Sequence, residues 1–230
     1  MTSERQRRIA QRLAAERRRQ ARRRRLSWLA AAVILVVLAS AVTVAALHRP
    51  DQATGDLGPE GMPLQAGTPL ASIAGAASGE TVDSIRCEAS EQVTYHIHAH
   101  LAVFVNGAAR SIPYGIGVVT PAVTQTTQGP FAQATRCYYW LHTHASDGII
   151  HVESPTQRQY TLGDVFAIWG QPLGKKQVGP ATGTVTAYLN GVRYTGDPGA
   201  IVLTEHQGIQ LDVGTPIVAP EPVDWSTSQL

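Results

Sequence analysis

The sequence predicts an α+β domain, built mainly from antiparallel β-hairpins with one packed helix and preceded by a single transmembrane helix. Three observations lead to this prediction. Apolar and polar residues alternate in several short segments, which is the period of a β-strand. Asn-Gly pairs separate two pairs of these segments, as in two-residue hairpin turns. One further segment combines a capping-box pattern with an apolar face of helical period.

The N-terminal region combines a basic tail with a long apolar run. Residues 1–25 hold eleven Arg and two Glu, and residues 26–47 contain no charged side chain. At about 1.5 Å per residue, a helix of this length spans the roughly 30 Å hydrocarbon core of a bilayer. The positive-inside rule then predicts a single-pass protein of the cell membrane, with a cytoplasmic N-terminus and an exported C-terminal domain.

Two other interpretations of this region are open. The first is a signal peptide that is cleaved after Ala41, at the small-residue sequence Ala39-Ser40-Ala41, although the apolar run continues beyond that point. The second is nucleic-acid binding by the arginines. Residues 51–230 carry seven Lys or Arg against fifteen Asp or Glu, so the exported part is acidic. We therefore expect a membrane and a metal ion as partners, and no nucleic acid; no pattern indicates a protein partner.

Composition divides the rest of the chain into three parts. Residues 48–80 are rich in Gly, Pro and Ala, which predicts a linker. Residues 81–214 are long enough to bury one hydrophobic core, and we expect them to form the exported His-rich domain. Residues 215–230 contain three prolines and are expected to form a loose C-terminal tail.

Alternation and turn residues define the expected strands of this domain. Asn106-Gly107 and Asn190-Gly191 are each expected to turn a hairpin, and His206-Gln207-Gly208 a third. Residues 115–130 contain Thr, Gly and Pro and are expected to form a loop. The expected strands cover residues 93–105, 108–113, 137–143, 149–153, 184–189, 192–195, 201–205 and 209–213.

One helix is expected, over residues 161–169. Thr161 is its N-cap, with Asp164 three residues later as in a capping box, and Gly170 can end the helix. Its apolar face consists of Leu162, Val165, Phe166 and Trp169.

The two cysteines, Cys87 and Cys137, both lie on the predicted exported side. An even number of cysteines in an oxidising compartment favours a disulfide. Two alternatives are open. Both thiols can be unpaired, or the Cys137 thiolate can be a metal ligand, since it lies five residues before His142.

Histidines provide the strongest functional pattern, because six of the eight fall within residues 96–151. The sequence HIHAH places three of them on one face of a strand, and WLHTH and IIHVES each place a polar pair on one face. Imidazole is the commonest ligand of borderline divalent metals. The candidate metal ligands are His96, His98, His100, His142, His144, His151 and Glu153.

Strand geometry limits which of these side chains can share an ion. Residues i and i+2 of a strand lie about 6.5–7 Å apart at the backbone, so their side chains can converge. His96 and His100 are nearly twice as far apart, so we expect at most two ligands from HIHAH. Glu205-His206 is a weaker candidate pair at a turn. By ligand type, a site of three His with or without Glu153 suits Zn, Cu, Fe or Mn. Outside the cell we expect copper or zinc, as a divalent or monovalent ion.

Three functions are compatible with this pattern. The leading one is an extracytoplasmic metal-binding domain for capture, buffering, sensing or delivery of copper or zinc. The second is a metal-dependent exported enzyme, a hydrolase or an oxidase, with Tyr138, Trp140 and Glu153 in supporting roles. The third is a structural or interaction domain whose histidines fill a polar pocket. The cupin spacing is absent, because Glu153 follows His144 by nine residues, and no nucleophile elbow surrounds Ser154.

Four sequence blocks carry a resemblance to an uncharacterised family of exported or membrane-anchored microbial His-rich domains. These blocks read CEASEQVTYHIHAHLAVFVNG, IPYGIGV, CYYWLHTHASDGIIHVESP and YTLGDVFAIWGQPL, and they extend over about residues 81–214. The resemblance implies that both cysteines and the histidines of HIHAH, HTH and IIHVES belong to a shared pattern. It implies no particular reaction.

Overall fold

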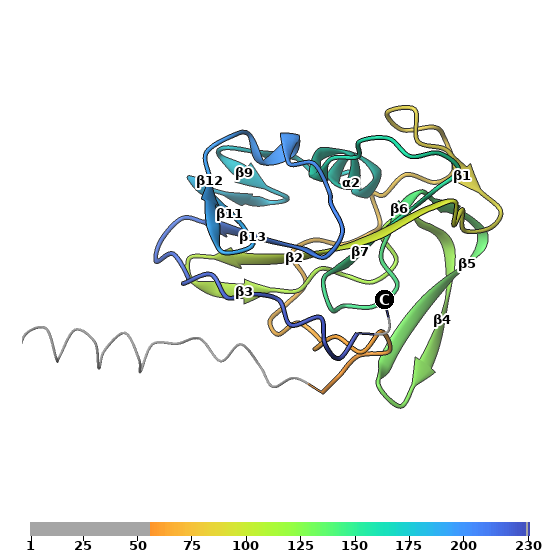
Figure 1. The fold of residues 1–230 in the computed structure, drawn as a ribbon, viewed down its shortest axis with the longest axis horizontal. Helices are drawn as coiled ribbons and strands as arrows, with labels where there is room; N and C mark the ends of the chain where they lie inside the picture. The colour runs from red at the N-terminus through yellow and green to blue at the C-terminus, as the bar shows by residue number, and fades with distance from the viewer. Residues whose placement is uncertain (1–55, 229) are drawn as a thin grey trace, which may run out of the picture. The chain divides into compact units, whose positions relative to one another are not determined.

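The computed structural model describes residues 56–228 and residue 230. Within them the chain is mostly β-sheet, with strands β1 to β13 and the single α-helix α2 (Figure 1). The expected α+β class is therefore wrong, and the domain is mainly β. The difference arises because α2 has only eight residues, and because the region 115–130, which was expected to be a loop, contains the long strand β4 and the start of β5.

A mixed sheet of seven strands forms the centre of the domain, in the order β12-β11-β13-β2-β7-β6, with β3 paired to β2. The strand β13 runs parallel to β2, with Ile209 opposite Leu101, while the other pairs are antiparallel. The strands of this sheet are β2 Tyr95–Val105, β3 Ala108–Arg110, β6 Leu141–His142, β7 Ile149–Ser154, β11 Val185–Leu189, β12 Val192–Tyr194 and β13 Gln207–Val213.

Two three-stranded sheets accompany the central sheet. The first joins the long strands β4 (Val118–Thr126) and β5 (Gly129–Tyr139) to the short β1 (Cys87–Glu88), at the right of Figure 1. The second consists of β8 Leu173–Gly174, β9 Gln177–Val178 and β10 Ala181–Thr182. The expected loop over residues 115–130 is wrong for most of its length. Its Val and Thr residues favour strands, but β4 is mostly exposed on both faces, so it shows no alternation of apolar residues.

Two of the three expected hairpins are confirmed. Asn106-Gly107 and Asn190-Gly191 connect β2 to β3 and β11 to β12, and all four residues have positive φ, as a two-residue turn requires. The third hairpin is wrong. Residues 201–205 form no strand beside β13 and make a single bridge, from Val202 to Thr161. Instead, β13 inserts between β11 and β2.

The helix α2 covers Leu162–Trp169, as expected from its signals. The Thr161 hydroxyl accepts a hydrogen bond from the Asp164 amide, and the Asp164 carboxylate accepts one from the Thr161 amide at 2.7 Å. Gly170 ends the helix in the left-handed conformation. A short 3₁₀ helix, η1, follows at Pro198–Ala200. The apolar side of α2 packs into the hydrophobic core, together with Leu101, Ile150 and Leu211 of the central sheet.

The two faces of the central sheet have different chemistry. Residues that lie directly opposite each other on neighbouring strands share a face. Ile97 opposite Val152 and Ala99 opposite Ile150 belong to the core face. His96 opposite Glu153 and His98 opposite His151 belong to the other face. The polar cluster therefore lies on the side of the sheet that faces away from α2.

Residues 56–80 and the C-terminal residues both lie against this domain. Met62 and Leu70 are buried, and the Gln65 amide donates a hydrogen bond to the Ser146 carbonyl. In the C-terminal part, the Val218 amide donates to Asp212 at 2.8 Å. The predicted tail 1–25 and membrane anchor 26–47 lie outside the described residues. No helix in the described part of the chain has the length and apolarity to cross a bilayer.

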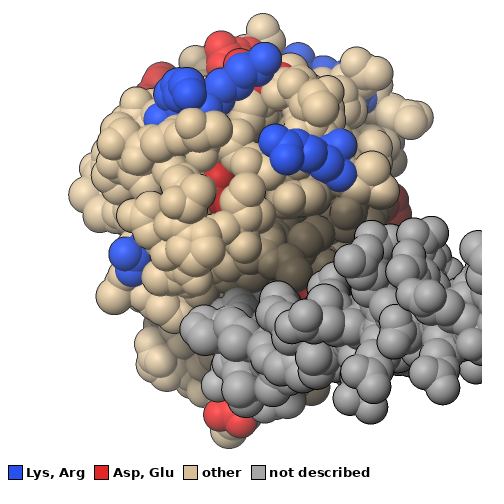
Figure 2. All heavy atoms as spheres, turned by 90° about the vertical axis from the view of Figure 1, so that its left-hand side faces the viewer, with Lys and Arg blue, Asp and Glu red and all other residues tan. Residues whose placement is uncertain are grey.

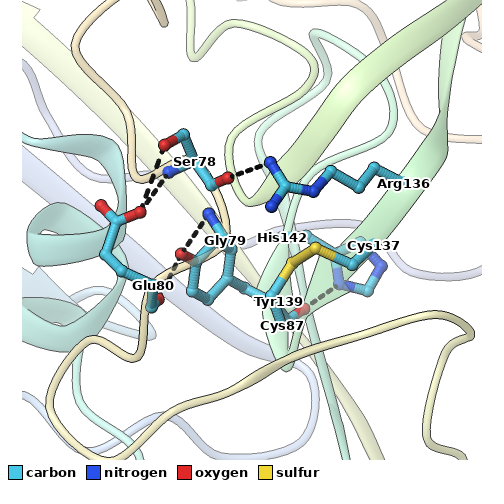
Figure 3. The surroundings of a disulfide bond; sticks show 8 residues. All are labelled: Ser78, Gly79, Glu80, Cys87, Arg136, Cys137, Tyr139 and His142. Carbon is cyan, nitrogen blue, oxygen red and sulfur yellow. Dashed lines mark hydrogen bonds between the residues drawn. A yellow bond between two sulfur atoms is a disulfide. The ribbon is translucent and has the colours of Figure 1, made fainter.

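The disulfide between Cys87 and Cys137 is confirmed, with 5.4 Å between the two Cα atoms. It joins β1 to β5 (Figure 3). Beside it, the Tyr139 hydroxyl accepts a hydrogen bond from the Gly79 amide, and Arg136 donates one to the Ser78 carbonyl. The alternatives of unpaired thiols and of a Cys137 thiolate ligand are therefore wrong.

Charged side chains are sparse on the face shown in Figure 2. The Lys and Arg residues that are visible there lie in separate groups, and most of the described surface on this face is uncharged.

Candidate metal centre

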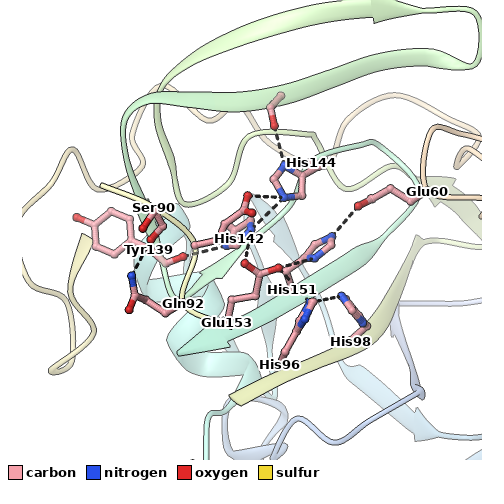
Figure 4. Close-up of polar contacts among 12 residues, drawn as sticks. Glu60, Ser90, Gln92, His96, His98, Tyr139, His142, His144, His151 and Glu153 are labelled. Carbon is pink, nitrogen blue, oxygen red and sulfur yellow. Dashed lines mark hydrogen bonds and ion pairs between the residues drawn. The ribbon is translucent and has the colours of Figure 1, made fainter. Parts of the chain in front are cut away.

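Three adjacent strands place three histidines in a row across the central sheet. His98 of β2 is opposite His151 of β7, and His151 is opposite His142 of β6. The ring centroids lie 4.7 Å apart for His98 and His151, and 5.2 Å apart for His151 and His142. All three side chains are buried. Alternation within each strand selects the face, and strand register brings the imidazoles together (Figure 4).

His144 joins this row from the turn after β6. Its Nε2 atom lies 3.1 Å from Nε2 of His142. Its Nδ1 atom donates a hydrogen bond to the Ala132 carbonyl at 2.7 Å, and Nδ1 of His142 donates to the Tyr139 carbonyl at 2.9 Å. Carbonyl oxygens only accept hydrogen bonds, so both Nδ1 atoms carry a proton. In the neutral rings the two Nε2 lone pairs then face each other, an arrangement that becomes favourable when a proton or a metal cation lies between them.

His151 is held by a carboxylate from a distant part of the chain. Its Nε2 atom donates to Glu60 at 2.7 Å, and its Nδ1 atom lies 3.4 Å from the Glu153 carboxylate. Burial lowers the pKa of His151, but the polar contact with Glu153, the hydrogen bond to Glu60 and the negative charges of both carboxylates outweigh burial and raise this pKa to about 10. The surroundings of His151 therefore favour a positive charge at this ring, which is a proton on Nδ1 when no metal ion is bound there.

Glu153 lies between two groups of histidines. Its Oε1 atom lies 3.1 Å from Nε2 of His96, and its Oε2 atom lies 4.0 Å from Nε2 of His142. His96 and His98 are themselves in contact, with 3.0 Å between their Nε2 atoms. Glu91 approaches from the other side, with an oxygen 3.4 Å from Nε2 of His144.

The protonation states of two of the histidines suit metal ligation. Burial, followed by the charges of His151 and His96, lowers the pKa of His98 to about 3. Burial and the charges of His144 and His151 lower the pKa of His142 well below its usual value. Since a metal ligand must be the unprotonated imidazole, both rings are available for a metal ion at neutral pH.

The structure thus brings together six of the seven predicted ligands and leaves one apart. Together with Glu91, these six residues form three groups whose ligand atoms lie within 4.8 Å of one another. His100 lies on β2, the strand of His96 and His98, but belongs to none of the three groups. It lines a cavity of about 400 Å³ together with Phe104 and Gln210. The groups are His96, His98, His151 and Glu153; His142, His144 and His151; and Glu91, His142 and Glu153.

The other residues named from the sequence have peripheral positions. The ring of Tyr138 lies 5.3 Å from that of His142, whereas Trp140 packs in the hydrophobic core. Glu205 accepts a hydrogen bond from the His98 amide, and His206 contacts Glu205 at an exposed turn.

Two acidic residues of the centre, Glu60 and Glu91, were not among the predicted ligands. Glu60 lies in the predicted linker, and Glu91 lies between Cys87 and the strand that bears HIHAH. Neither follows an alternating pattern, so no local signal indicates their position.

Comparison of the chain with protein-family models, curated proteins and solved structures gave no match. The fold and the site define a mainly β domain with a buried cluster of His and Glu side chains that can hold a metal ion. The resemblance of the four sequence blocks to a family of exported His-rich domains stays a prediction.

Proposed function

We propose that the protein is a membrane-anchored extracytoplasmic domain that binds a divalent transition metal, copper or zinc, and serves to capture, buffer or deliver it. The observation that carries this proposal is the contact between His142 and His144. Their Nε2 atoms lie 3.1 Å apart in a buried site, and both Nδ1 atoms are already committed to backbone carbonyls. Such outer hydrogen bonds are what orient metal-binding imidazoles and select their tautomer.

The distance between these two nitrogens fits shared coordination. With metal–nitrogen bonds of about 2.0–2.1 Å, two ligands that subtend 90–110° at the ion lie roughly 2.9–3.4 Å apart. The observed 3.1 Å falls within this range. His151 belongs to the same compact group, and its Nδ1 atom can become a third ligand when a metal ion displaces the proton from it. Oxygen atoms of Glu91 or Glu153 can complete a four-coordinate site.

Unsatisfied polar atoms in the cluster also favour a cation. Among the described residues, His151 Nδ1 and Glu153 Oε2 are buried without a hydrogen-bond partner. A buried polar atom without a partner costs about 1–3 kcal/mol. A bound divalent ion removes this cost for both atoms, and it neutralises the carboxylates that surround His151.

The choice of metal and of compartment follows from the ligands and the disulfide. Imidazole with carboxylate suits copper(II) or zinc, whereas magnesium and calcium prefer sites made of oxygen alone. The Cys87–Cys137 disulfide is typical of an oxidising compartment outside the cytoplasm. This supports the export that the basic tail and the apolar segment 26–47 predict.

Metal titration of the full chain, prepared without a His tag, tests this proposal. We expect wild-type protein to bind Cu²⁺ or Zn²⁺ stoichiometrically, and the H142A/H144A variant to bind at least 100-fold more weakly at this group. The H206A variant is the matched control, because His206 is exposed and lies outside the three groups. If H142A/H144A keeps its circular dichroism spectrum and binds as many ions as tightly as wild type, the proposal is wrong.

A further inference from the structure

We infer that the cluster holds two metal ions, with the second ion bound by His96 and His98 and the Glu153 carboxylate bridging the pair. This inference rests on the proposed function, because the first ion is the one between His142 and His144. To the proposed function it adds a second metal site, a bridging ligand and a ratio of two metal ions per chain.

The extent of the cluster is too large for a single ion. Two ligands of one ion can be at most about 4.2 Å apart, twice a metal–nitrogen bond of about 2.1 Å. His96 and His98 form one compact group, and His142 and His144 form another. No group contains members of both pairs, although His151 belongs to both of these groups. The ligands are therefore arranged as two neighbouring sites.

The second group has the geometry of a coordination site in its own right. Nε2 of His96 lies 3.0 Å from Nε2 of His98 and 3.1 Å from Oε1 of Glu153. Both distances fall in the range of about 2.9–3.4 Å that is expected for ligands at neighbouring positions on one ion. His98 and Glu153 are buried, whereas the side chain of His96 is 40% exposed. An ion at this site would therefore be reached from solvent at His96.

Glu153 is placed to connect the two ions. Its two carboxylate oxygens face different groups, since Oε1 contacts His96 and Oε2 is nearest to His142. Oε2 is buried and has no hydrogen-bond partner in the described part of the chain. In two-metal sites the ions are about 3.5–4 Å apart, a separation that one carboxylate can bridge through its two oxygens.

The simplest competing explanation is a hydrogen bond between His96 and His98, with one Nε2 donating to the other. That bond satisfies these two nitrogens without a metal ion. It leaves Glu153 Oε2 and His151 Nδ1 without partners, although both residues are 4% exposed and belong to the same group of ligands as His96 and His98. The two-ion arrangement accounts for all four atoms.

Copper(II) is the probe that tests this inference on the full chain, by metal analysis and electron paramagnetic resonance. We expect two Cu²⁺ per chain in wild-type protein, with a weakened signal and a half-field transition, because a bridging carboxylate couples the two ions magnetically. The variant H96A should bind one Cu²⁺ and show a full-intensity signal of an isolated ion. Because His96 is partly exposed, this change should leave the fold intact. The variant E153Q should lose the half-field transition, and H206A should match wild type.

The outcomes separate this inference from the proposed function. Wild-type protein that binds no Cu²⁺ would overturn both. A single Cu²⁺ per chain that depends on His142 and His144, and is unchanged in H96A, would overturn the second site alone. Two uncoupled Cu²⁺ ions, with the same signal in E153Q, would overturn the bridge.

Discussion

The imidazole of His151 donates a 2.7 Å hydrogen bond to the carboxylate of Glu60, although 91 positions separate the two residues in the sequence. Both side chains are buried, and the opposite nitrogen of the ring points to Glu153. This is the arrangement of a carboxylate that orients a metal-binding histidine from outside the coordination sphere. A segment whose composition predicts a linker thus contributes directly to the candidate centre.

Replacing Glu60 by Gln should weaken metal binding by about 10- to 100-fold, the usual effect of removing such a carboxylate. The amide can still accept a hydrogen bond from His151, but it lacks the charge that favours a cation. Competition with a chromophoric chelator measures the change. Glu80→Gln is the matched control, because Glu80 is exposed and its pKa is lowered mainly by backbone hydrogen bonds at the surface. Equal affinities for E60Q and wild type would contradict the role given to Glu60.

Zinc should stabilise the folded protein, because the converging ligands exist only in the folded state. At a free Zn²⁺ concentration 100 times the dissociation constant, the free energy of unfolding should rise by about 2.7 kcal/mol per site. Thermal unfolding with and without Zn²⁺ measures this gain, and addition of a chelator should reverse it. The H142A/H144A variant should show a clearly smaller shift; an undiminished shift would place the stabilising ion elsewhere.

Loss of the disulfide should lower the free energy of unfolding by about 2–5 kcal/mol. Cys87 and Cys137 are 50 positions apart, so the bond closes a long loop in the unfolded chain. Urea unfolding of the C87S/C137S variant provides the measurement. A reducing agent should destabilise wild type by a similar amount and leave the variant unchanged. Wild type that is insensitive to reduction would show that the bond contributes little.

The metal-free protein should lose stability as the pH falls from about 6.5 to 4, in part through His100. Burial lowers the pKa of His100 to about 4 in the folded state, below the value of about 6.5 in an unfolded chain. Protonation therefore favours the unfolded state across this window, by at most about 3 kcal/mol for this group. Urea unfolding at pH 7, 5 and 4 should show that H100Q loses less stability than wild type. If the free energy of unfolding falls equally in H100Q and wild type, His100 does not cause the loss of stability at low pH.

Local signals in the sequence predicted the elements that depend on neighbouring residues. The capping box of Thr161 and Asp164 and the stop at Gly170 determine α2. The two Asn-Gly pairs turn hairpins because Asn and Gly accept positive φ at low cost. Each of these features depends on backbone conformations and hydrogen bonds within a few residues, so the sequence alone is sufficient to predict them.

The elements that were predicted wrongly depend on distant contacts. The strand β4 pairs with β5 along its length but remains largely exposed itself, so no apolar alternation marks it. The strand β13 pairs in parallel with β2 rather than with the segment that precedes it. A parallel pairing joins strands that lie far apart in the chain, and here no turn residue indicates it.

In the candidate centre, too, some features follow from neighbouring residues and others depend on distant contacts. By itself, the sequence determined which histidines share a face of a strand, because side-chain alternation is a property of the extended backbone. The tertiary structure decided the rest. Register aligns His98, His151 and His142 across three strands, and it leaves His100 apart. It also brings Glu60 to His151. Metal coordination requires ligand atoms within a few tenths of an ångström of their positions, and only the packing of distant segments provides such precision.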